Sequence, residues 1–156
     1  MAKPYIHALN SAKKYGGIFE DYMEIHEFID SSKAAYPSVK HRALTHNSWF
    51  IGVVLPKVFG ETFKRKSDGV IISTRDIGEQ HVLEDFQGKF IPTPQDFLQE
   101  MDFKDWMDNG NGEPPSSHSK VDKYNNQNKN DFIIHKFPDY IEPTRFPGDD
   151  LSRTLD

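Results

Sequence analysis

The sequence predicts a mainly α-helical fold: a compact domain of four to five helices with one small β-hairpin, followed by an extended, largely irregular C-terminal tail. Apolar residues recur at helical spacing, and proline and glycine stand where the helices would begin and end. After residue 108 the composition changes to Asn, Gly, Ser, Pro and Lys, which supply almost no core. We therefore assign residues 1–108 to the helical domain, 109–130 to a flexible linker and 131–156 to an extended interaction tail.

Three helices open the domain. Pro4 stands at a favourable first helical position and predicts a helix over residues 4–15, which ends at a glycine pair. Residues 19–33 are apolar over a wide arc and predict the second helix. Residues 38–55 carry two apolar stripes, so we expect one long central helix that packs against several neighbours and that Pro56 kinks or ends.

A hairpin and a further helix follow. Residues 62–73 hold Asp68-Gly69 between two short arms, which is a strong signal for a hairpin turn. Ser73 and Asp76 form a capping pattern that starts a helix ending near Gly88. Gly78 lies inside this helix at a cost of about 1 kcal/mol relative to alanine, which predicts a close packing contact or access for a partner.

The last helix begins at Thr93, which is a good N-cap residue, and Pro94 occupies its first position. We expect Phe103, Trp106 and Met107 to complete the packing as a final turn.

Composition limits the chemistry. The chain has no cysteine, so nitrogen and oxygen ligands must hold any bound metal. A net charge of -5 argues against nucleic acid as a partner, because such binding comes largely from phosphate neutralisation. The apolar stretches are too short to cross a bilayer, and residues 1–14 lack the apolar core of a secretory signal. We expect a cytoplasmic protein without membrane contact.

The candidate chemistry lies in histidines with acidic neighbours one helical turn away. His26 precedes Asp30 by four residues, so the carboxylate could orient a ligating imidazole; a surface His-Asp pair is the alternative. His81 precedes Asp85 by four residues, and a lattice of surface ion pairs is the alternative there.

His41 and His46 are five residues apart. On one helix this spacing separates them by about 140°, because each residue advances by ~100°. We therefore expect that they do not share a metal and that one of them joins histidines from other helices. A hydrogen-bonded core histidine is the alternative for each.

Together these residues form a candidate set of nitrogen and oxygen ligands for a divalent metal: zinc, manganese or iron. A water on such a metal could attack a phosphoester. The set is similar to that of the HD-domain phosphohydrolases, helical enzymes that gather His, His-Asp and Asp ligands from separate helices. The chain departs from that pattern because it has no adjacent His-Asp pair, and Asn47 follows His46. The candidate ligands are His26, His41, His46, His81 and Asp85.

Four segments carry a family resemblance: residues 26–33 (HEFIDSSK), 41–48 (HRALTHNS), 75–85 (RDIGEQHVLED) and 90–93 (FIPT). In these the chain resembles a family of small uncharacterised proteins of bacteria and bacteriophages, known as a domain of unknown function, over about residues 4–108. The resemblance implies a compact helical domain of phage or bacterial origin, located in the host cytoplasm or the virion. It implies no activity.

The tail supplies a second candidate site, for a protein partner. Its large apolar residues are Phe132, Ile133, Ile134, Phe137, Tyr140 and Ile141. Such anchors in a solvated segment are typical of chains that fold on a partner. The sequence favours a non-enzymatic binding, assembly or accessory protein whose tail docks on a partner or a neighbouring subunit. The alternatives are a metal-binding domain with phosphohydrolase activity and a regulator that inhibits a host enzyme through its acidic tail.

Overall fold

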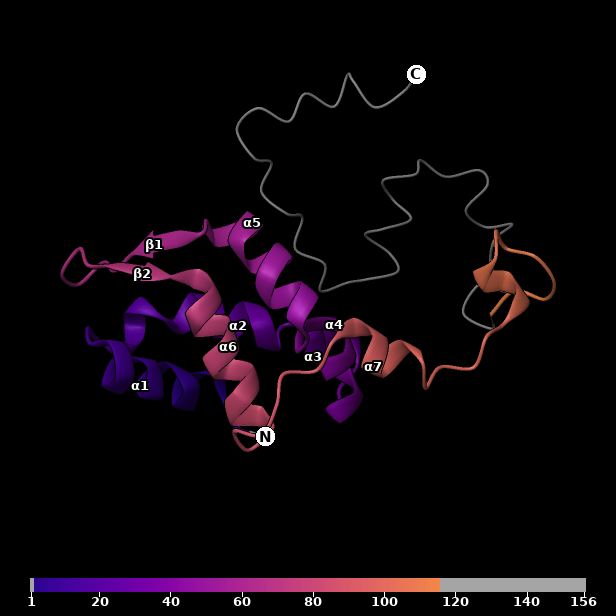
Figure 1. Ribbon diagram of the computed structural model, residues 1–156, viewed down its shortest axis with the longest axis horizontal. Coiled ribbons are helices and arrows are strands. Elements are labelled where there is room, and N and C mark those ends of the chain that lie inside the picture. Colours follow the sequence, from indigo (N-terminus) through magenta and orange to yellow (C-terminus); the bar gives the residue numbers. More distant parts are fainter. Residues whose placement is uncertain (1, 116–156) are drawn as a thin grey trace, which may run out of the picture. The chain divides into compact units, whose positions relative to one another are not determined.

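The computed structural model describes residues 2–115, which fall into two units that divide after Lys104. The predicted interaction tail, residues 131–156, lies outside the described residues. In the first unit (Figure 1) the elements are α1 (Pro4–Tyr15), α2 (Met23–Asp30), α3 (Ser32–Ala35), α4 (Arg42–Thr45), α5 (Leu55–Phe59), β1 (Thr62–Lys64), β2 (Ile71–Ser73), α6 (Thr74–Asp85) and α7 (Pro94–Leu98). The second unit contributes a 3-10 turn, Asp105–Met107. The expected fold class, mainly helical with one hairpin, is confirmed.

Local capping signals are confirmed. α1 ends at Gly16, whose φ of 87° lies in the left-handed region that favours glycine. The Ser73 side chain accepts a hydrogen bond from the backbone of Asp76 at the start of α6. Thr93 and Asp96 form a reciprocal capping box at the start of α7. Strands β1 and β2 pair antiparallel, as the Asp-Gly turn predicts.

The long helix expected over residues 38–55 is wrong. A 3-10 turn, Val39–His41, leads into the short α4, and the chain leaves helical geometry at His46, with φ −102° and ψ 56°. The Asn47 side chain then accepts a hydrogen bond from the backbone of Phe50, which begins a π-helical segment, Phe50–Val54, that continues into α5. Asparagine caps a new helix start here, and this local bond competes with a continuous helix.

Two smaller corrections follow. The helix expected over residues 19–33 is divided into a 3-10 turn, α2 and α3, and at the division the Ser31 hydroxyl donates to the carbonyl of Phe28. Pro56 lies in the first turn of α5 instead of ending a helix. The expected packing of three apolar residues is also wrong, because exposed fractions are 67% for Phe103, 36% for Trp106 and 38% for Met107.

The core forms where α6 packs against α1, α2 and α5, and Figure 1 shows α6 running through the middle of the first unit. Its fully or nearly buried apolar members are Ala8, Tyr22, Ile25, Ile29, Phe50, Leu55 and Ile77. Among residues 2–115, no helix has the length and apolar character needed to cross a membrane.

Gly78 lies at the contact between α6 and α5. A Cβ atom added to it would be 2.6 Å from Leu55 Cδ1 and 3.1 Å from Ile51 Cγ2, which is closer than normal packing allows. The structure therefore accounts for this glycine by the close packing contact that the sequence suggests.

We expect Gly78→Ala to lower the free energy of unfolding by about 1 kcal/mol. Adding a methyl group to a filled core destabilises the fold by about 1–3 kcal/mol, whereas alanine is more favourable than glycine inside a helix by about 1 kcal/mol. Urea denaturation measures the difference. Gly52→Ala is the matched control, because nothing lies within 4 Å of a Cβ added there. A Gly78→Ala variant about 1 kcal/mol more stable than the wild type would mean that Leu55 moves aside without cost.

Candidate metal centre

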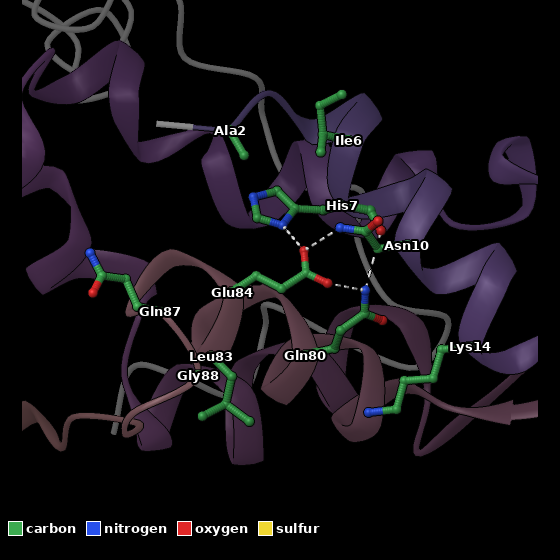
Figure 2. Close-up of a pocket in the computed structure, with 10 residues that line it drawn as sticks. All are labelled: Ala2, Ile6, His7, Asn10, Lys14, Gln80, Leu83, Glu84, Gln87 and Gly88. Atoms are coloured by element: carbon green, nitrogen blue, oxygen red, sulfur yellow. Dashed lines mark hydrogen bonds and ion pairs between the residues drawn. The ribbon is translucent and has the colours of Figure 1, made fainter.

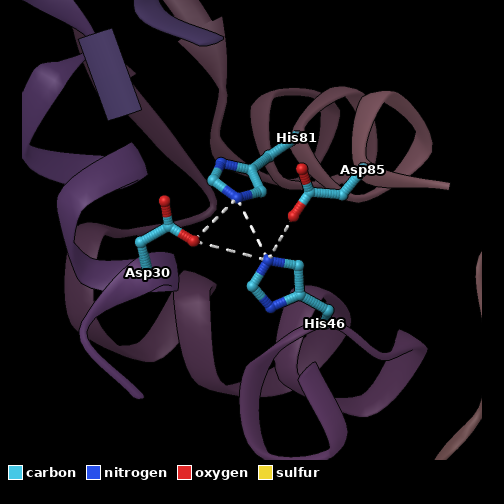
Figure 3. Close-up of side chains that lie close together, drawn as sticks. All are labelled: Asp30, His46, His81 and Asp85. Carbon is cyan, nitrogen blue, oxygen red and sulfur yellow. Dashed lines mark hydrogen bonds and ion pairs between the residues drawn. The ribbon is translucent and has the colours of Figure 1, made fainter. Parts of the chain in front are cut away.

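Four buried side chains converge from three parts of the first unit (Figure 3). Asp30 is the last residue of α2, His46 directly follows α4, and His81 and Asp85 lie one turn apart on α6. One nitrogen or oxygen atom from each lies within 4.8 Å of the others. Asp30 is 5% exposed, and His46 and His81 are fully buried. We call these four residues the Asp-His group.

The spacing of these atoms fits a single ion. His46 Nε2 lies 3.0 Å from Asp85 Oδ2 and 3.2 Å from His81 Nε2. Asp30 Oδ1 lies 3.5 Å from His81 Nε2 and 3.6 Å from His46 Nε2. Four ligands at ~2.1 Å from a common tetrahedral ion are about 3.4 Å from one another. The Asp-His group can therefore hold a metal ion with little movement.

Three carboxylate oxygens of the group lack a partner in good hydrogen-bond geometry. Within residues 2–115 these are Asp30 Oδ1, Asp30 Oδ2 and Asp85 Oδ2, whose contacts are ion pairs. Leaving such an atom unsatisfied in a low-dielectric interior is costly, and a bound cation would remove that cost.

Both carboxyl groups are ionised. Burial opposes the charge, but His46 and Lys33 hold the pKa of Asp30 well below its usual value. Burial also opposes the charge of Asp85, yet contacts with His46, His7 and Arg42 lower its pKa in the same way. These contacts include Lys33 Nζ at 2.8 Å from Asp30 Oδ2 and Arg42 Nη2 at 3.3 Å from Asp85 Oδ2. Carboxylates, the protonation state that binds a metal, are thus already present.

The structure brings together three of the predicted ligands, His46, His81 and Asp85, and adds Asp30. His26 lies outside the Asp-His group, because its Nδ1 is 2.9 Å from His81 Nδ1 and its Nε2 is 2.8 Å from Ser11 Oγ. Both of its nitrogens are therefore occupied. Asp30, which the sequence paired with His26, instead points its Oδ1 at His46 and His81.

His41 also lies outside the Asp-His group, although it touches His46. Its Nδ1 is 2.7 Å from Ser32 Oγ, and the two imidazole ring centroids are 4.9 Å apart. The expected separation of about 140° assumed one continuous helix. Because the helix breaks at His46, that assumption is wrong, and the rings come into contact.

His7 is a neighbour of the group that the sequence did not reveal. Its ring stacks on His81 at 3.9 Å, its Nδ1 donates to Glu84 Oε2 at 2.6 Å, and its Nε2 is 3.5 Å from Asp85 Oδ1. Burial disfavours the charge, but Asp85 and Glu84 raise the pKa of His7 to about 9. No local pattern marks His7, since its partners are more than 70 residues away in the chain.

A pocket of about 520 Å³ is lined by His7 and by no member of the Asp-His group. Figure 2 shows His7 and Glu84 side by side in its wall, with Asn10 and Gln80 also bonded to Glu84. Lys14 adds a cationic side chain to the lining. His7 is thus the residue shared by the pocket and the surroundings of the Asp-His group.

The family model described as Domain of unknown function (DUF6915) matches residues 2–107, and the chain belongs to that family. This confirms the resemblance to a domain of unknown function over nearly the span that the sequence predicts. Comparison with curated proteins and with solved structures found no match.

We expect the metal-free protein to lose stability steeply below pH 6.5. Burial lowers the pKa of His26 to about 2 and the pKa values of His41 and His81 to about 4. The unfolded chain therefore takes up these protons first, and each histidine costs on the order of 1.4 kcal/mol per pH unit until the folded form is also protonated.

The raised pKa of His7 acts in the opposite sense: its contribution is complete below pH 6.5 and is lost as the pH rises towards about 9. Urea denaturation in a chelator at pH 7.5, 6.0 and 5.0 measures both effects. A free energy of unfolding that stays constant from pH 7 to pH 5 would contradict the burial of three neutral histidines.

Proposed function

We propose that the domain is a metal-binding module that holds one divalent transition-metal ion in the Asp-His group. The observation that carries the proposal is the convergence of four buried donor atoms at ligand-to-ligand spacing, two of them carboxylate oxygens whose contacts are ion pairs without good hydrogen-bond geometry. An ion there would join the end of α2, the residue after α4 and the last turns of α6, and so would stabilise the fold.

The donor set favours zinc, manganese or iron over calcium and magnesium. Two imidazole nitrogens with two carboxylate oxygens suit borderline transition metals. Calcium takes six to eight oxygen ligands, and magnesium prefers an octahedral shell of oxygens, whereas this group offers two nitrogens and two oxygens. Lys33 and Arg42 compete with the ion for the carboxylates, so we expect moderate affinity.

Protein purified without a histidine tag is expected to carry about one equivalent of metal and to bind Zn²⁺ or Mn²⁺ again after chelation. At a metal concentration of about 100 times the dissociation constant, binding stabilises the fold by ~2.7 kcal/mol. Elemental analysis, calorimetric titration and thermal unfolding measure these quantities. His46→Gln and Asp85→Asn should abolish stoichiometric binding.

The matched control uses a neighbouring residue outside the Asp-His group. Glu79→Gln removes an exposed carboxylate from α6, where it pairs with Arg75, and should retain binding. Absence of metal in the purified wild type, together with no thermal shift on adding zinc, manganese or iron, would refute the proposal.

Hydrolysis of a phosphoester is the second candidate function, supported by the pocket beside His7. The Asp-His group has two histidines and two aspartates, the same ligand types that HD-domain phosphohydrolases use, although no solved structure matches this fold. A bound metal would supply Lewis-acid chemistry. Lys14 could then bind a phosphate in the pocket, and the charged His7 could donate a proton to a leaving group.

If this activity exists, the Mn²⁺-loaded protein should hydrolyse p-nitrophenyl phosphate or its diester faster than Mn²⁺ alone. Lys14→Ala should raise KM about tenfold or more, because a hydrogen bond to a charged group contributes about 1.5–3 kcal/mol, whereas Lys57→Ala, an exposed lysine on α5, should not. A stoichiometrically loaded protein without turnover would exclude hydrolysis of these esters and leave the metal-binding proposal intact.

Docking through the tail, a phage or bacterial origin and a cytoplasmic location are retained as proposals. The docking proposal rests on the apolar residues between Phe132 and Ile141 in the sequence. The origin and the location, in the host cytoplasm or the virion, rest on the family resemblance.

A further inference from the structure

A chain of hydrogen bonds connects His81 to the wall of the pocket through three side chains. His81 Nδ1 is 2.9 Å from His26 Nδ1, and His26 Nε2 is 2.8 Å from Ser11 Oγ. Ser11 Oγ lies 2.8 Å from Gln80 Oε1 and 3.1 Å from the backbone carbonyl of His7. All of these side chains are at most 6% exposed, so water does not supply alternative partners.

The direction of this chain follows from counting protons. The orientation of the Gln80 amide is fixed, because its Nε2 donates to the carboxylate Glu84 Oε1 at 2.7 Å and faces the His7 carbonyl at 3.3 Å. Its Oε1 therefore faces Ser11 as an acceptor. Ser11 has one proton and two neighbours that can only accept, Gln80 Oε1 and the His7 carbonyl. The third neighbour of the hydroxyl, His26 Nε2, must be the donor.

The position of the proton on His26 determines the position of the proton on His81. Neither ring nitrogen of His26 contacts a carboxylate, and a neutral imidazole carries one proton. With that proton on Nε2, the Nδ1 of His26 is an acceptor, so Nδ1 of His81 must carry the proton that it shares with His26. A neutral His81 protonated at Nδ1 has its lone pair on Nε2, the atom that faces His46 and Asp30.

We propose that Gln80, Ser11 and His26 are positioning residues that hold His81 as the Nδ1-protonated tautomer, with its Nε2 lone pair directed into the Asp-His group. The positioning role rests on the proposed metal-binding function. The tautomer itself is a property of the metal-free protein and can be measured there. Hydrogen bonds to the second nitrogen of a ligating histidine fix its tautomer and orientation, and their loss costs about 10–100-fold in metal affinity.

The decisive measurement is the tautomer of each histidine in the metal-free protein, read from long-range ¹⁵N–¹H correlation spectra near neutral pH. We expect His26 to be protonated at Nε2 and His81 at Nδ1. Since a free neutral imidazole favours protonation at Nε2, the result for His81 is not the default. Protonation of His81 at Nε2 would overturn the inference, even if the protein binds metal.

Substitution gives a second and independent readout. Ser11→Ala removes the acceptor of the His26 proton, so His81 should lose its single tautomer and Zn²⁺ affinity should fall about 10–100-fold. Ser31→Ala, a serine at the end of α2 outside this chain of bonds, should change neither. His26→Asn retains an acceptor near the position of Nδ1 and should preserve more of the affinity than His26→Leu.

The outcomes separate the two proposals. Wild-type protein that shows the expected tautomers but binds no metal would refute the metal-binding function and support the hydrogen-bond assignment. Wild-type protein that binds Zn²⁺ with an affinity unchanged by Ser11→Ala would refute the positioning role. If Ser11→Ala does not fold, the tautomers of the wild-type protein still decide the assignment.

Discussion

The fold depends on satisfying a set of polar side chains that it buries along α6. Apart from the face that carries Arg75 and Glu79, this helix is largely buried. Ile77 and Val82 are fully buried, and Gln80 and His81 are buried in hydrogen-bonded surroundings. Burying an unpaired polar group costs several kcal/mol, comparable to a large share of the stability of a small domain. The elements around α6 must therefore supply matched hydrogen bonds on one side and close packing on the other.

Sequence patterns correctly predicted the helix caps and the hairpin, which depend on residues close to one another in the chain. The caps at Ser73 and Thr93 and the Asp-Gly hairpin each depend on residues within four positions of one another, and all three form as expected. The pairing of His81 with Asp85 in one site follows from their spacing on one helix. The break at His46 was missed because apolar spacing continues through it, and a single side chain, Asn47, decides in favour of a new helix start.

The rest of the centre could not be read from the sequence because it is assembled by tertiary packing. Asp30 was assigned to His26 by helical spacing, but the end of α2 directs its carboxylate toward residues from other elements. His7 has no acidic neighbour in the sequence, and its partner Glu84 is 77 residues away. Helical periodicity describes which residues share a face, and it contains no information on which faces meet.

Each histidine of the Asp-His group is held by a chain of hydrogen bonds, and the two chains differ in whether their donor-to-acceptor direction is fixed. The chain behind His81 ends at an amide whose orientation a carboxylate fixes, so it has one direction. The chain behind His46 runs through the hydroxyls of Thr45 and Ser32 to His41. Hydroxyl protons rotate, so this chain can reverse.

Under the proposed metal-binding function, this difference would suit a site that exists both with and without an ion. In the metal-free state His46 Nε2 can carry a proton and donate to His81 Nε2, 3.2 Å away, which avoids two facing lone pairs. To hold the proposed ion through Nε2, His46 would have to carry its proton on Nδ1 and donate it to Thr45. The reversed hydroxyl chain would then donate to Nδ1 of His41, which would carry its own proton on Nε2. Lys33 and Arg42 meanwhile keep the carboxylates paired before the ion binds.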